Sequence, residues 1–96
     1  MILLMYKRLL TLSSMILNRK IAEVVGWYGT VAIVLGYALV SFGTISADSW
    51  IFQALNLSGA LGIIVISLVK HVRQSVALNL FWGTIALIAL LRIATK

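Results

Sequence analysis

The side chains that could carry out chemistry are few and widely separated in this sequence. It contains two acids, Glu23 and Asp48, one histidine, His71, and no cysteine. General acid–base catalysis, nucleophilic catalysis and metal binding each need such groups in pairs or clusters. His71 follows Lys70 in a basic stretch, where a single histidine is normally solvated. We therefore predict no enzyme activity, no catalytic residues, no metal ligands and no cofactor.

Two amides, Asn56 and Asn79, are the strongest polar groups inside long apolar stretches. A buried amide is costly unless it is hydrogen-bonded, so both should face protein or a water-filled cavity. At a rise of 1.5 Å per residue, Asn56 lies roughly 9 Å from one membrane boundary and Asn79 roughly 6 Å from the other, too far apart to pair. Ser67 or Trp27 lies at the depth of Asn79. The candidate intramembrane binding residues are Asn56, Asn79, Tyr37 and Trp82. Structural hydrogen bonding is the alternative that we favour for both amides.

The composition is that of a membrane protein. Of 96 residues, 62% are hydrophobic and 10% are charged, whereas soluble domains carry about 25% charged residues. A β-barrel is excluded because residues 60–66 are almost continuously apolar instead of alternating. Nucleic-acid binding is not expected, since the basic residues flank the apolar stretches as they do in membrane proteins.

Three apolar stretches predict three membrane-spanning helices, at about residues 24–45, 50–69 and 74–93. Each is close to the 20 or so residues that cross a bilayer. The loops between them are short, so consecutive helices should be antiparallel neighbours, and Asp48 should be the N-cap of the second. The fold class is therefore an all-α membrane protein, an up-down-up three-helix bundle within residues 21–96.

The distribution of Lys and Arg predicts the orientation. The N-terminal segment and the second loop together contain six: Lys7, Arg8, Arg19, Lys20, Lys70 and Arg73. The other side has only Arg92 and Lys96. Positive residues concentrate on the cytoplasmic side. We expect a bacterial inner-membrane protein with a cytoplasmic N-terminus and a periplasmic or extracellular C-terminus.

Residues 1–20 allow two interpretations. Lys7, Thr11, Ser14 and Asn18 fall at helical spacing, which indicates an amphipathic helix on the inner membrane surface. The alternative is that translation starts at Met15, which would make the preceding residues a spurious extension. A cleaved signal peptide is not expected, because no small-residue cleavage site follows the apolar run.

Small residues recur on one face of each predicted span. Small side chains let membrane helices approach closely, so we expect these positions to pack against neighbouring helices. The predicted packing residues are Gly29, Gly36, Gly43, Gly59, Gly62 and Gly83.

Several short strings resemble known proteins. The Gly26–Gly29 string, the Asn56–Ala60 string, and Asn79 with Trp82 resemble a family of small uncharacterised bacterial three-helix transmembrane domain proteins, over about residues 24–93. In architecture alone, the chain distantly resembles the SemiSWEET half-transporters for sugars. That resemblance implies a homodimer with Asn79 at a substrate contact, although the Pro-Gln hinge of those proteins has no counterpart here.

Two functions follow as expectations. The first is a structural or interaction module that packs through its small-residue faces, with the lipid bilayer, a second copy or another membrane protein as its partner. The alternative is a homodimeric half-transporter for a small polar solute.

Overall fold

The computed structural model describes residues 1–16 and 19–96, and within those ranges it is helical with no strand. The helices are α1 (Ile2–Ile16), α2 (Arg19–Ser41), α3 (Trp50–Val69) and α4 (Arg73–Ala94). Three of them, α2, α3 and α4, are long and apolar enough to span a membrane. The chain therefore has the makeup of a multi-pass membrane protein.

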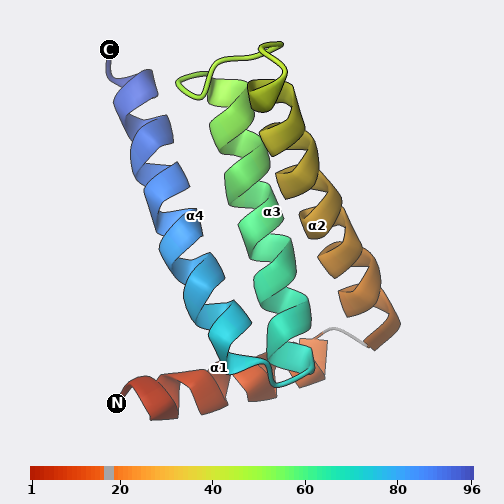
Figure 1. Ribbon diagram of the computed structural model, residues 1–96. Coiled ribbons are helices and arrows are strands. Elements are labelled where there is room, and N and C mark those ends of the chain that lie inside the picture. The colour runs from red at the N-terminus through yellow and green to blue at the C-terminus, as the bar shows by residue number, and fades with distance from the viewer. Residues whose placement is uncertain (17–18) are drawn as a thin grey trace.

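Helix α3 is the centre of the structure. It packs along α2 on one side and along α4 on the other, whereas α2 and α4 make at most marginal contact with each other. Figure 1 shows α3 between the other two long helices, with the α2–α3 turn at one end and the α3–α4 turn at the opposite end. Helix α1 lies across the end that carries the α3–α4 turn and contacts α3.

The contacts between the long helices are made mainly by small residues. The buried positions of α2 are all small: Ala22, Gly26, Gly29, Ala32 and Gly36. Large apolar side chains point outward instead, such as Phe81, which is 71% exposed, and Val24, which is 66% exposed. Small side chains at the helix contacts and large apolar side chains on the outside suit a chain whose outer surface contacts lipid.

Helix α2 ends earlier than predicted. It stops at Ser41 and not near residue 45, because Gly43 adopts the left-handed conformation, with φ +77°. The Gly43 amide donates to the Val40 carbonyl and the Thr44 amide donates to the Leu39 carbonyl, both across about 3 Å. This pair of bonds is a Schellman C-cap. The prediction that Gly43 packs against a helix is therefore wrong: Gly43 is exposed, and a Cβ there would meet nothing.

The other ends show smaller differences. Helix α2 begins at Arg19, five residues before the predicted span, because a helix can continue into the headgroup region where charged side chains are hydrated. Ser49, not Asp48, is the N-cap of α3, since the Ser49 hydroxyl accepts from the Phe52 amide at 3.2 Å. The predicted Asp48 cap is wrong by one position. The Asp48 amide instead donates to the Ser46 hydroxyl.

Helix α1 is anchored near the start of α4. The Arg73 guanidinium carbon lies 5.8 Å from the centroid of the Tyr6 ring, within the range of a cation–π interaction. Lys7 and Thr11 of the predicted polar stripe are exposed. The predictions for Ser14 and Asn18 concern a side chain and a residue outside those that the structure describes.

Candidate functional site

A close contact between backbones joins α2 to α3 through glycines. A Cβ on Gly29 would overlap the Gly59 carbonyl oxygen, and a Cβ on Gly62 would lie 2.6 Å from the Val25 carbonyl oxygen. The other glycines predicted to pack are less confined. A Cβ on Gly36 would lie 3.4 Å from the Phe52 ring, and one on Gly83 would lie 3.4 Å from Ala60, both ordinary contacts. Gly29, Gly59 and Gly62 thus set the distance between the two backbones.

A groove runs along α3 between α2 and α4. It consists of three adjoining hollows of about 210, 200 and 300 Å³. The first and second hollows share Ile66 and Lys70, and the second and third share Ile63. The groove therefore extends from the α1 end of the bundle towards its middle. It stays open because α2 and α4 do not close over it.

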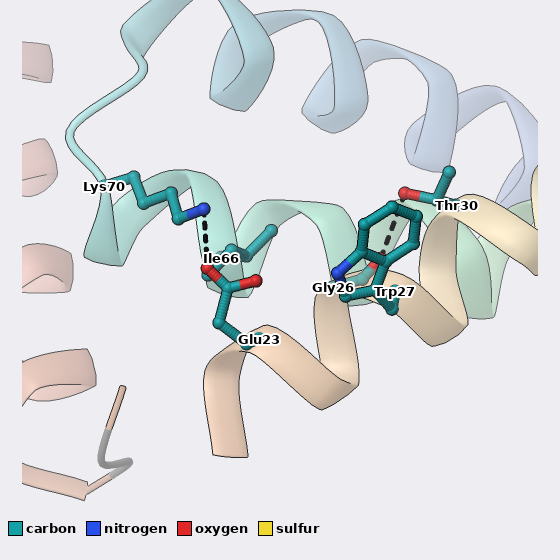
Figure 2. A pocket seen from close by; sticks show the side chains of 6 residues that line it. All are labelled: Glu23, Gly26, Trp27, Thr30, Ile66 and Lys70. Atoms are coloured by element: carbon teal, nitrogen blue, oxygen red, sulfur yellow. Dashed lines mark hydrogen bonds and ion pairs between the residues drawn. The ribbon is translucent and has the colours of Figure 1, made fainter. Parts of the chain in front are cut away.

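The α1 end of the groove is charged. Figure 2 shows the side chain of Lys70, the C-cap residue of α3, reaching to Glu23 on α2, where its ammonium lies 2.5 Å from a carboxylate oxygen. Both side chains remain accessible, at 43% and 36% exposure. Beside them, the Trp27 indole and Thr30 line the same hollow, and the Thr30 hydroxyl donates to the Gly26 carbonyl at 3.1 Å.

Hydroxyl and amide groups line the groove further from this end. The Ser67 hydroxyl of α3 donates to the Ser75 hydroxyl of α4 at 2.7 Å, and the Asn79 amide donates to the Ser75 carbonyl at 2.9 Å. The predicted partners of Asn79, Ser67 and Trp27, are therefore not the groups that it bonds. The carbonyl four residues earlier in the same helix lies within reach of a short amide side chain, so the Asn79 amide donates to that carbonyl instead.

Two of the four predicted binding residues line the innermost hollow. Asn79 and Trp82 line it together with Leu78 of α4 and two isoleucines, Ile33 of α2 and Ile63 of α3. Asn79 is 6% exposed, and within the described chain no donor reaches its side-chain oxygen. The hollow is thus apolar apart from one buried amide.

The other two predicted residues lie elsewhere. Tyr37 is 72% exposed on the outer surface of α2. Asn56 is 5% exposed on α3, and its amide forms no hydrogen bond with any described residue. It does not line the hollow that holds Asn79. The direction in which each side chain points could not be predicted from the sequence.

Sequence reasoning missed three polar contacts between helices. They are the Ser67–Ser75 bond, the Glu23–Lys70 ion pair and the 2.8 Å bond between the Tyr28 and Ser58 hydroxyls. Ser67 and Ser75 stand at similar distances from the loop that joins α3 to α4. Equal spacing from a tight turn could have indicated this bond in the sequence, because it brings two residues of antiparallel helices to the same height along the bundle.

Comparison with known proteins supports a family assignment and nothing more specific. No curated protein and no solved structure matches the chain, so similarity to the SemiSWEET proteins is not shown. A family model matches residues 22–96, which include all of α3 and α4 and nearly all of α2. On that match, the chain belongs to an uncharacterised bacterial protein family.

Proposed function

We propose that the chain is an integral protein of the bacterial inner membrane that crosses the bilayer three times, up, down and up. Its N-terminus and the α3–α4 turn lie in the cytoplasm, and its C-terminus lies outside. The count of Lys and Arg supports this orientation, because six flank the α1 end and two lie at the C-terminus. The position of α1 across the same end fits a helix on the inner membrane surface.

Its role in this proposal is that of a structural or interaction module, without enzymatic activity, which associates with itself or with another membrane protein. The observation that carries the proposal is the open arrangement of the helices: α3 packs on both neighbours, while α2 and α4 barely touch. The close backbone contacts at Gly29, Gly59 and Gly62 are used inside the chain. A partner would therefore meet the outer faces of α2 and α4.

Reporter fusions test the topology. Fusions after Asp48 and after Lys96 should report the outer compartment, and one after His71 should report the cytoplasm. A cytoplasmic signal from the Lys96 fusion would contradict the three-span model. The mass of the purified protein in mild detergent, with cross-linking from the outer faces, tests association. A strict monomer with no cross-linked partner would contradict the interaction module.

One observation favours the half-transporter as a second candidate. Asn79 and Trp82 line a hollow of about 300 Å³, at the lower end of the volumes of small-molecule sites. A screen of small polar solutes against the wild-type protein and the Asn79→Leu variant tests it. Binding that the variant loses, in a protein that is a dimer, would support transport. A monomer that binds no solute would remove this candidate.

A further inference from the structure

We propose that the groove between α2 and α4 binds one anionic phospholipid, with its phosphate at Lys70 and one acyl chain extending to Trp82. This rests on the proposed insertion of the three helices in a bilayer and adds a ligand to it. Four properties of the groove support the proposal: its length, its charge, its hydrogen-bond donors and its apolar inner end.

The groove has the length of one leaflet. Its polar end lies at the α3–α4 turn, and Trp82 stands nine residues into α4 from Arg73. At 1.5 Å per residue that distance is roughly 14 Å. The hydrocarbon core is about 30 Å thick, so the groove reaches about the middle of the bilayer, as one acyl chain does.

The charge at the open end suits an anion. Six basic side chains flank the α1 end of the bundle against one acid, Glu23. Basic clusters at the inner boundary attract anionic headgroups, and each Lys or Arg contributes to that attraction. Lys70 is the member of this cluster that lines both of the outer two hollows. The Lys70 side chain is 43% exposed, so a phosphate can reach it beside the ion pair with Glu23.

A hydroxyl donor accompanies Lys70. Ser75 lines the same hollow of about 200 Å³ and accepts a hydrogen bond from Ser67. No acceptor for the Ser75 hydroxyl proton is present in the described part of the chain. The lysine ammonium and the serine hydroxyl together offer charge-assisted and neutral donors to the phosphate and ester oxygens of a lipid.

The inner end of the groove suits a hydrocarbon chain. Ile33, Ile63, Leu78 and Trp82 line the hollow of about 300 Å³ with only the Asn79 amide among them. The order from charge through hydroxyl to apolar surface follows the order of groups in a phospholipid. A water-soluble phosphate would fill only the outer part.

Native mass spectrometry of the full chain in mild detergent tests the proposal. The ligands are phosphatidylglycerol, phosphatidylcholine with the same acyl chains, and glycerophosphate as the soluble headgroup. We expect one phosphatidylglycerol to be retained in preference to phosphatidylcholine, and glycerophosphate not to be retained. Equal retention of the two lipids would overturn the proposal, as would retention of glycerophosphate at the level of phosphatidylglycerol.

Two charge variants at one ion pair separate lipid binding from a structural role. Lys70→Gln should weaken the retention of phosphatidylglycerol about fivefold, the effect of one basic residue near a membrane surface. Glu23→Gln should strengthen it, because it removes a repelling carboxylate and frees the Lys70 ammonium. Lys96→Gln, which removes one positive charge as Lys70→Gln does but at the other end of the bundle, should not change the retention of phosphatidylglycerol. If Lys70→Gln and Glu23→Gln both weakened retention, the pair would be structural and the proposal wrong.

A pair of steric variants tests the acyl position. Ile63→Phe should reduce lipid retention by filling the groove, whereas Leu61→Phe, at a residue that is 55% exposed and outside the groove, should not. Equal retention by both variants would place the acyl chain elsewhere and overturn the proposal. Extraction of cell membranes with alkaline carbonate reports separately on insertion. A protein released by alkali would contradict the proposed membrane topology, whatever the lipid measurements show.

Discussion

Gly29 and Gly59 meet backbone to backbone in the contact between α2 and α3. A Cβ placed on Gly59 would lie 2.9 Å from the Gly29 carbonyl oxygen, and one placed on Gly29 would overlap the Gly59 carbonyl oxygen. Neither obstacle is a flexible side chain, so no rotamer change can relieve it. The two helices must separate or shift if either residue gains a side chain. In lipid, where no hydrophobic drive holds helices together, such close packing is a main source of stability.

The Gly29→Ala variant should therefore lose stability while Gly36→Ala should not. Overpacking a tight contact costs roughly 1–3 kcal/mol, whereas a Cβ at Gly36 would make ordinary contacts with Phe52 and Leu55. Unfolding of the purified variants in mixed detergent micelles would measure both. A larger side chain, as in Gly36→Leu, should destabilise, because its outer atoms would collide with Phe52. Equal stability of Gly29→Ala and the wild type would contradict this account of the α2–α3 contact.

Tyr28→Phe should lower stability by about 0.6 kcal/mol, the average for hydrogen bonds between membrane helices. It deletes the bond between the Tyr28 hydroxyl of α2 and the Ser58 hydroxyl of α3. Tyr37→Phe is the matched control, since Tyr37 is 72% exposed and no hydrogen bond of its hydroxyl occurs within the described chain. The same unfolding assay should find the control unchanged. A loss of equal size in both variants would assign the effect to the aromatic hydroxyl in general and not to this bond.

The Ser67–Ser75 bond is a polar contact between α3 and α4. A double-mutant cycle with Ser67→Ala and Ser75→Ala should give a coupling energy of about 0.6 kcal/mol. The carbonyl of Ser75, which binds Asn79, remains in the alanine variant, so that bond is not disturbed. Additive effects of the two substitutions would show that the hydroxyls do not depend on each other.

The spans were predictable because length and hydropathy alone decide whether a helix can cross a bilayer. The second predicted range coincides with α3, which lies between the Ser49 cap and the charged Lys70. Gly29, Gly36 and Gly43 recur every seven residues, and this spacing was ambiguous, since helix packing and helix capping both favour glycine. Gly43 is followed by Thr44 and other polar residues, and that change of composition is the mark of a helix C-terminus.

The candidate site was predictable only where its residues share a helix. Asn79 and Trp82 stand three residues apart on α4, so they lie on the same side of it in any fold. Contacts such as Glu23 with Lys70 depend on how α2 is rotated against α3. That rotation follows from the glycine contact, which hydropathy does not reveal. The same limitation explains why the predicted proximity of Tyr37 to the other candidate residues is not found: Tyr37 is exposed and lines none of the three hollows.

Asn79→Leu should leave the stability unchanged or raise it. The Asn79 amide bonds only to a carbonyl of its own helix among the described residues, so its loss breaks no contact between helices. Removing an incompletely bonded polar group from an apolar hollow is favourable. The unfolding assay distinguishes this result from a structural role between helices, in which the variant should lose about 0.6–2 kcal/mol. A clear loss of stability would show that the amide joins two helices.

The last prediction concerns the attachment of α1. The Tyr6 ring lies under the Arg73 guanidinium, while its hydroxyl is buried and has no hydrogen-bond partner among the described residues. Tyr6→Phe keeps the ring and removes the unpaired hydroxyl, so α1 should stay attached at least as firmly. Tyr6→Leu removes the ring, and the loss of a cation–π contact worth about 0.5–1 kcal/mol should free α1 more often. Limited proteolysis after Lys7 and Arg8 would measure this, with faster cleavage expected in Tyr6→Leu than in Tyr6→Phe. Faster cleavage in both variants would show that the hydroxyl, and not the ring, holds α1 in place.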